Sequence, residues 1–172
     1  LREALVRVVH GGPDQYTAVL FCGSGTLCMD ACLSSLLPEG KKALIVNNGA
    51  YSARAAEICR YYGLPHTELK LPYDRPATPE AVEQALRAHP ETALVYSTHH
   101  ETGTGLLNPL YELGTLAHRY GAIFVTDTTS SYAMRPLSIA ESEIDFCMAS
   151  AQKGLMGMTG LSFVIGRRDL LE

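Results

Sequence analysis

Short apolar runs alternate with helix-like stretches along most of this chain, and this alternation limits the possible folds more than any other feature. The runs have the length of buried strands, whereas the stretches between them carry apolar residues at helical spacing. We expect strands at 16–22, 42–46, 66–71, 93–97, 123–127, 144–149 and 161–165, and helices at 1–9, 25–37, 50–62, 79–89 and 109–120. Strands that alternate with helices predict an α/β fold with a mostly parallel sheet.

The composition of the chain limits which partners it can bind and in which cellular compartment it is expected. The 172 residues suit one domain, and the net charge of −4 without a basic cluster argues against a nucleic-acid partner. No apolar run approaches the roughly 18 residues of a membrane span, and there is no signal-peptide pattern, so we expect a cytoplasmic protein without a membrane partner. No zinc-binding spacing or CxxC pair occurs, so we expect no metal site. We interpret all five cysteines as reduced core residues: Cys22, Cys28, Cys32, Cys59 and Cys147.

The segments that follow the expected strands are the first place to look for a site. In parallel α/β sheets, ligands bind outside the carboxyl ends of the strands. Five such segments are rich in polar or small residues: 23–26 (GSGT), 48–51 (NGAY), 99–102 (HHET), 127–129 (DTT) and 150–153 (SAQK). We expect these segments to form the site.

The Gly-Ser-Gly-Thr turn at 23–26 joins a strand to a helix. Its glycines allow a tight turn, and the free N–H groups at the start of the helix favour an anion such as phosphate. A glycine turn with Ser24 or Thr26 as a simple helix cap explains the pattern equally well. Cys28 stands where a dinucleotide-binding fingerprint needs glycine, and the segment lacks the Gly-Lys-Ser/Thr ending of a P-loop.

Asp127 and Lys153 are the two charged residues that most need explanation. Asp127 ends the expected strand 123–127, where a carboxylate loses solvation unless a cation or hydrogen-bond donor meets it. Lys153 lies among small residues and glycines; it is either a solvated loop cation or a desolvated amine that can bond an aldehyde. A cofactor with a phosphate, a pyridinium nitrogen and an aldehyde needs an anion cradle, a carboxylate and a lysine. The chain offers all three in that order.

Five segments together resemble the class V aminotransferases, fold type I enzymes that use pyridoxal 5′-phosphate (PLP). They are GSGT (23–26), NNGAYSARA (47–55), THHETGTGLLNPL (98–110), FVTDTTSSY (124–132) and SAQKGLMGMTGLSFVIGRRDLL (150–171). The resemblance covers nearly the whole chain. It implies a three-layer αβα PLP-binding large domain, truncated at both ends, with residues 1–172 forming most of that domain and the small domain absent. It also implies a homodimer whose partner chain contributes to the phosphate site.

The resemblance implies catalytic and phosphate-binding roles for matching residues. Lys153 would bond the cofactor and then move a proton on it. Asp127 would pair with the pyridinium nitrogen and keep it protonated. The residues expected to hold the phosphate are Ser24, Gly25, Thr26 and Gln152.

The resemblance also implies which residues contact the cofactor ring. Tyr51 would stack on one face of the ring, Thr129 would lie against the opposite face, and Thr102 would approach the ring hydroxyl. Glu101 and Asn108 belong to the matching segment without a chemical role, and we expect them to support the loop.

The donor substrate is less well specified. The most similar branch of the family transfers an amino group from the small amine 2-aminoethylphosphonate to the keto acid pyruvate, and the alanine–glyoxylate branch is a close relative. Gly103 replaces a hydroxyl residue expected after Thr102, and Gln152 before the lysine is typical of the alanine–glyoxylate branch. A PLP lyase or a non-catalytic nucleotide-binding module are further alternatives. We expect the fragment alone to have little or no transaminase activity.

Overall fold

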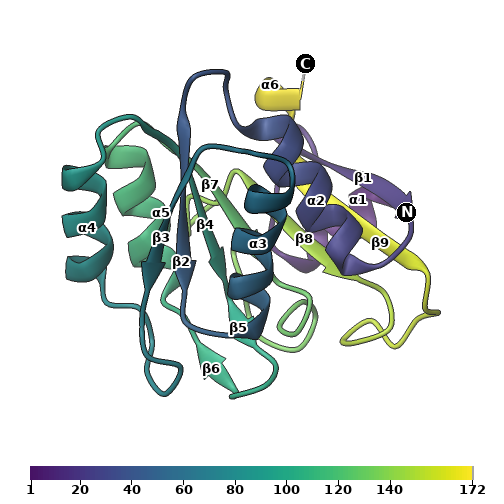
Figure 1. Cartoon of the computed structure of the whole chain (residues 1–172). Helices are drawn as coiled ribbons and strands as arrows, with labels where there is room; N and C mark the ends of the chain where they lie inside the picture. Colours follow the sequence, from purple (N-terminus) through teal and green to yellow (C-terminus); the bar gives the residue numbers. More distant parts are fainter. Residues whose placement is uncertain (172) are drawn as a thin grey trace.

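A seven-stranded sheet runs through the centre of the computed structural model, which describes residues 1–171 (Figure 1). Its strands are β1 (Tyr16–Cys22), β2 (Lys42–Asn47), β3 (His66–Lys70), β4 (Thr92–Thr98), β7 (Ile123–Asp127), β8 (Phe146–Ser150) and β9 (Leu161–Arg167). The order across the sheet is β1-β9-β8-β7-β4-β2-β3. Strands β3, β2, β4, β7 and β8 pair in parallel, whereas β9 is antiparallel to both of its neighbours. The prediction of a mostly parallel α/β sheet is confirmed.

Six helices occur in the described residues, and all except the last lie where the apolar periodicity predicts them. They are α1 (Arg2–Val8), α2 (Gly25–Leu36), α3 (Ala50–Tyr61), α4 (Pro79–Ala88), α5 (Leu110–Arg119) and the short α6 (Arg168–Leu171). The start of α4 shows how the local sequence determines where a helix begins. Thr78 accepts a hydrogen bond from the Ala81 amide at 3.3 Å, and Pro79 opens the helix where no amide hydrogen is needed.

The helices form two layers that enclose the sheet. Helices α2 and α3 pack on one face, and α1, α4 and α5 pack on the other (Figure 1). Along β2, Leu44 and Val46 join the core of one face, whereas Ala43 and Ile45 join the core of the other. Because both faces are buried, the strands read as continuous apolar runs rather than alternating ones. Burial of one such leucine or isoleucine contributes about 1.5–3 kcal/mol, and the three-layer αβα prediction is confirmed.

Two features differ from the expectations or add to them. The loop 99–108 contains a small hairpin of β5 (His100–Glu101) and β6 (Leu106–Leu107), whose strands are too short to predict from periodicity. The interpretation of all five cysteines as core residues is wrong for Cys22, which is exposed because it ends the edge strand β1; the other four are buried. Within residues 1–171, no helix is long and apolar enough to cross a membrane.

Candidate active site

A cavity of about 170 Å³ opens at the carboxyl ends of the parallel strands. The last residues of three strands line it: Thr98 of β4, Asp127 of β7 and Ser150 of β8. Helices α2 and α3, which follow β1 and β2, contribute their first turns. The other lining residues are Ser24, Gly25, Thr26, Met29, Tyr51, Arg54, His100, Thr129, Ser130, Gln152 and Lys153. The expectation that the segments after the strands converge is therefore confirmed.

Lys153 is held in this cavity by hydroxyl groups rather than by a carboxylate. Its Nζ donates to Ser130 Oγ at 2.7 Å and to Thr102 Oγ1 at 2.9 Å, and these two hydroxyls also contact each other. The same Nζ lies 5.4 Å from the centroid of the Tyr51 ring. No acid of residues 1–171 forms an ion pair with Lys153. Its amine is therefore positioned without a neutralising charge, as a nucleophilic lysine requires.

Asp127 is buried and poorly satisfied. One of its oxygens, Oδ1, accepts a hydrogen bond from the Thr129 amide at 2.8 Å, and no cation of residues 1–171 forms an ion pair with it. Burial raises the pKa of the Asp127 carboxyl above its usual value, and the Thr129 side chain and amide, together with the positive charge of Lys153, offset this only in part. A buried carboxylate in this state gains free energy from any cationic hydrogen-bond donor that enters the cavity.

The amino end of α2 presents free donors to the same cavity. Ser24 is the N-cap residue, yet its side chain makes no capping hydrogen bond, and the first turn of α2 carries no acidic residue. A side chain at Gly25 would crowd the hydroxyls of Thr129 and Ser150 at 3.1 and 3.4 Å. Neither hydroxyl has a hydrogen-bond partner within residues 1–171. The turn therefore has uncapped amides and nearby hydroxyls that suit an anion.

Glu101 fixes Tyr51 at the start of α3. Its carboxylate is buried and accepts hydrogen bonds from the Tyr51 amide (3.1 Å), the Ser52 amide (2.9 Å) and the Ser52 hydroxyl (2.8 Å). A negative charge at the N-terminus of a helix is favourable, and it satisfies amides that lack partners within the helix. Gly49 is required here, because any side chain at this position would overlap the Glu101 carboxylate.

Asn108 ties together the loops behind the cavity. It exchanges two side-chain hydrogen bonds with Asn48, at 2.7 and 3.0 Å, and it also bonds the Thr98 carbonyl and the Ala77 amide. All of these groups except the Ala77 amide follow or end the central strands β2 and β4. The structure thus gives Glu101 and Asn108 the supporting role that was expected of them.

His99 lies beneath the cavity and is uncharged. Burial, reinforced by the nearby His100 and Arg135, lowers its pKa to about 4. Its Nδ1 lies 2.8 Å from Ser131 Oγ, and that hydroxyl donates its one hydrogen to the Thr128 carbonyl. The hydrogen bond between Nδ1 and the Ser131 hydroxyl holds the imidazole ring in a buried position.

The structure brings almost all the sequence-predicted residues together. Of the nine residues predicted to bind the cofactor or to take part in catalysis, eight line the cavity: Ser24, Gly25, Thr26, Tyr51, Asp127, Thr129, Gln152 and Lys153. Thr102 does not line it but contacts the amine of Lys153. His100 and Ser150 lie in segments that were expected to form the site but had no assigned role, and the sequence reasoning missed Met29, Arg54, Thr98 and Ser130. Ser130 had a signal, since it lies in the hydroxyl-rich stretch after Asp127, and Arg54 lies three residues after Tyr51, on the same side of a helix.

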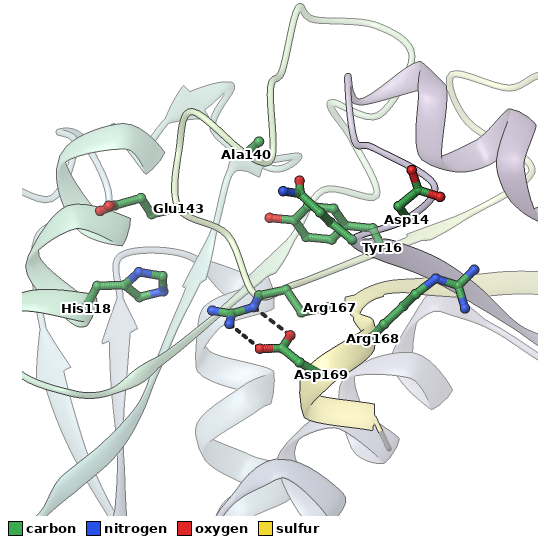
Figure 2. Close-up of a pocket in the computed structure, with 9 residues that line it drawn as sticks. Asp14, Tyr16, His118, Ala140, Glu143, Arg167, Arg168 and Asp169 are labelled. Carbon is green, nitrogen blue, oxygen red and sulfur yellow. Dashed lines mark hydrogen bonds and ion pairs between the residues drawn. The ribbon is translucent and has the colours of Figure 1, made fainter.

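A larger cavity of about 810 Å³ lies at the opposite end of the sheet, near the start of β1 and the end of β9 (Figure 2). Two of its charged side chains, Arg167 and Asp169, pair with each other, whereas Asp14, Glu143 and Arg168 form no ion pair in the described part of the chain. Arg167 bonds Asp169, as Figure 2 shows, and also bonds the buried Asp145 beneath. None of the predicted site residues lines this cavity.

Sheet order and cavity position define the class: the chain has the fold of the fold type I aminotransferases. An alanine–glyoxylate aminotransferase from Nostoc sp. superimposes with a TM-score of 0.90 at 25% identity, over 99% of this chain and 44% of that one. An aspartate aminotransferase from Thermus thermophilus gives 0.88 at 27% identity, over 99% and 47%.

The chain belongs to the aminotransferase class-V family, whose sequence profile matches residues 2–172. Two similar curated relatives are 2-aminoethylphosphonate–pyruvate transaminases from Burkholderia thailandensis (40% identical) and Paraburkholderia phymatum (38%). Each match covers 98% of this chain and 45% of the relative, so the chain spans less than half the length of these relatives.

Proposed function

We propose that this chain binds PLP and forms most of the large domain of a transaminase, with the small domain outside this chain. The observation that carries the proposal is the shared cavity of Lys153, Asp127 and the uncapped start of α2, in a member of the class V family. Each group answers one chemical requirement of the cofactor. When bound, PLP supplies an aldehyde and an electron-withdrawing ring.

The unpaired groups of the cavity fit the polar atoms of that cofactor. The Asp127 carboxylate, which has few partners in the chain, would accept the hydrogen of the ring nitrogen. The start of α2 and Gln152 would hold the phosphate, together with the buried hydroxyl of Ser150. The half-buried Tyr51 would cover one face of the ring and Thr129 the other.

Lys153 would perform the proton transfer. Its Nζ would bond the cofactor and, once the donor amine had taken its place, would be free to carry a proton between the two carbon atoms that flank the transferred nitrogen. Ser130 and Thr102 lie within 3 Å of this nitrogen and would hold it while it is free. Their hydroxyls can accept from the ammonium form and donate to the amine form.

The donor we favour is 2-aminoethylphosphonate, with pyruvate as the acceptor. Curated relatives of that name are 37–40% identical to the chain. The second candidate is an alanine–glyoxylate type of transamination, favoured by the Gln-Lys pair at 152–153 and by the Nostoc structure. Both reactions need a small amine donor and a keto acid.

We further propose that the protein is a cytoplasmic homodimer. Exposed apolar side chains, Met134, Met156 and Met158, lie on loops next to the cavity, and contact with a second copy would cover them. Cys22 is exposed and four thiols are buried without disulfides, which suits a reducing compartment.

Absorbance and labelling test the cofactor proposal. We expect the chain to turn yellow with added PLP and borohydride to fix the cofactor on the peptide that contains Lys153. Lys153→Ala should prevent both. Lys42→Ala is the matched control, because Lys42 pairs with Glu91 at the other end of the strands. A colourless wild-type chain, or equal labelling of many lysines, would contradict the proposal.

A donor comparison separates the two candidate reactions. The protein that carries this chain together with its small domain is mixed with 2-aminoethylphosphonate, alanine or serine without a keto acid. The donor that bleaches the yellow band fastest identifies the half-reaction. A preference for alanine or serine would favour the second candidate.

A further inference from the structure

Arg54 presents an unneutralised positive charge to the active-site cavity. It lies on α3, one helical turn after Tyr51, and its guanidinium carbon is 5.6 Å from the Tyr51 ring centroid. Its Nη1 donates to Thr26 Oγ1 at 3.3 Å, on the first turn of α2. Within residues 1–171, no carboxylate forms an ion pair with Arg54. The guanidinium is therefore held beside the anion-binding turn by a neutral hydroxyl.

Two buried hydroxyl groups of the cavity also lack a hydrogen-bond partner. The hydroxyls of Ser150 and Thr98 are each 2% exposed, line the same cavity, and have no hydrogen-bond partner in the described part of the chain. Ser150 lies close to Gly25, so its hydroxyl and the uncapped amides of α2 face the same space. Several donors and one cation thus converge where an oxyanion with several acceptor atoms would satisfy them together.

Lys153 does not fill this role. Its Nζ donates to two hydroxyls, of Ser130 and Thr102, and is needed for the covalent bond to the cofactor. Asp127 is the one acid among the described lining residues, and it requires a cationic donor rather than an anion. Arg54 has the planar fork of donors that matches the oxygens of a phosphate or phosphonate in a bidentate manner.

We propose that Arg54 binds a tetrahedral phosphorus oxyanion at the start of α2, either the phosphate of the cofactor or the phosphonate of the amine donor. The inference rests on the proposed PLP-dependent function and adds a specificity residue to it. The Arg54 side chain is exposed, lines the cavity and already reaches the first turn of α2 through Thr26.

PLP-binding measurements on Arg54→Gln and Arg54→Lys test whether Arg54 binds the phosphate of the cofactor. Arg60→Gln is the matched control, since Arg60 lies on the same helix but pairs with Glu68 away from the cavity. If Arg54 binds the cofactor phosphate, Arg54→Gln weakens PLP binding by roughly 10- to 100-fold and leaves binding of pyridoxal, which lacks the phosphate, unchanged. Arg54→Lys should recover part of the loss, because it keeps the charge but not the fork.

Steady-state kinetics test whether Arg54 binds the phosphonate of the amine donor. These measurements use the protein that includes the small domain. If Arg54 binds the phosphonate, Arg54→Gln leaves PLP affinity intact, raises KM for 2-aminoethylphosphonate by roughly 10- to 100-fold, and leaves KM for alanine unchanged. The inference is overturned if neither PLP affinity nor this KM changes. It is also overturned if PLP and pyridoxal weaken alike, because Arg54 would then act only through Tyr51.

Inorganic phosphate separates failure of the inference from failure of the proposed function. At equal ionic strength, phosphate should raise the Tm of the wild-type chain above its value in chloride, and Arg54→Gln should abolish the increase. If the wild-type chain binds no PLP but phosphate still raises its Tm, the proposed PLP-dependent function is contradicted and the anion site at Arg54 is supported. A wild-type chain whose Tm phosphate does not raise overturns the inference even if PLP binds.

Discussion

Two aspartates are buried at opposite ends of the neighbouring parallel strands β7 and β8, and the chain surrounds them differently. Asp127 is the last residue of β7, and Asp145 immediately precedes β8. Both are at most 5% exposed. Asp145 has partners for both of its oxygens, whereas the one protein hydrogen bond described for Asp127 comes from the Thr129 amide. Burial is the same in the two cases, so the difference lies in the partners.

The partners of Asp145 come from three separate segments. Oδ1 accepts from Arg167 Nη1 at 2.8 Å, and Oδ2 accepts from His118 Nε2 at 2.8 Å and from the Phe124 amide at 2.7 Å. His118 and Arg167 also line the larger cavity, where Figure 2 shows both side chains. Such a carboxylate joins β7, β9 and α5, so its role is structural. An acid that the chain leaves without such partners is the better candidate for binding a ligand.

The largest effect should follow from removal of the fully paired acid. Asp145→Ala leaves Arg167, His118 and the Phe124 amide without their buried acceptor. Arg167 keeps its exposed partner Asp169, but three hydrogen bonds to a buried charge are lost and the Phe124 amide stays unsatisfied, so we expect the free energy of unfolding to fall by about 3–5 kcal/mol. Urea denaturation followed by circular dichroism measures it. A loss below about 1 kcal/mol would show that Asp145 does not hold these segments together.

Removal of one partner of Asp145 should cost less. His118→Ala keeps the bonds of Asp145 to Arg167 and to the Phe124 amide, and His118 is itself partly exposed. We expect a loss of about 1–2 kcal/mol, the contribution of one hydrogen bond to a charged group. The same denaturation experiment on His118→Gln is informative, because glutamine can still donate to Asp145 Oδ2. If the two variants lose equal stability, the side-chain packing of His118 matters and the hydrogen bond does not.

The poorly paired acid should give an effect of the opposite sign. Asp127→Asn keeps an acceptor for the Thr129 amide and removes the charge, so we expect the cofactor-free chain to gain about 0.5–2 kcal/mol at neutral pH. The same variant should lose PLP affinity, because the partner of the ring nitrogen is gone. Urea denaturation and PLP titration measure the two effects. A loss of stability without cofactor would place Asp127 with Asp145 as a structural acid.

The pH dependence of that gain follows from the raised pKa of Asp127. The carboxyl ionises at about pH 4 in the unfolded chain and at a higher pH in the folded chain, so its contribution to stability is lost as the pH rises through this window. Asparagine does not titrate. The advantage of Asp127→Asn should therefore be smaller at pH 5 than at pH 8, and equal advantages at both would contradict a raised pKa.

The architecture could be predicted because the apolar periodicity carries it. Every strand of the main sheet and every helix except α6 was expected within two residues of its observed ends. The direction of β9 was not predictable, because a short apolar run buried on both faces reads the same in parallel and antiparallel pairing. The hairpin of β5 and β6 rests on two residue pairs and leaves no periodic signal.

The site could be predicted where one residue type answers one chemical need, as with Lys153 and Asp127. The remaining site residues could not be predicted, because the path of the backbone decides which of several similar side chains reaches the cavity. Four hydroxyl residues directly follow Asp127, and only the turn after β7, where the Ser131 amide bonds the Thr128 carbonyl, decides that Ser130 meets the lysine. Likewise, Arg54 reaches the cavity only because α3 packs beside α2.

The smallest effect should come from the exposed second partner of Arg167. Asp169 bonds the guanidinium at the edge of the larger cavity, but its side chain is 61% exposed, and water can replace it. Because exposed ion pairs contribute little, we expect Asp169→Asn to lower the free energy of unfolding far less than Asp145→Ala does, and less still at high salt. Denaturation at two salt concentrations measures this. A loss as large as that of Asp145→Ala would mean that Arg167 is held from the surface, and that the buried carboxylate is not the centre of this cluster.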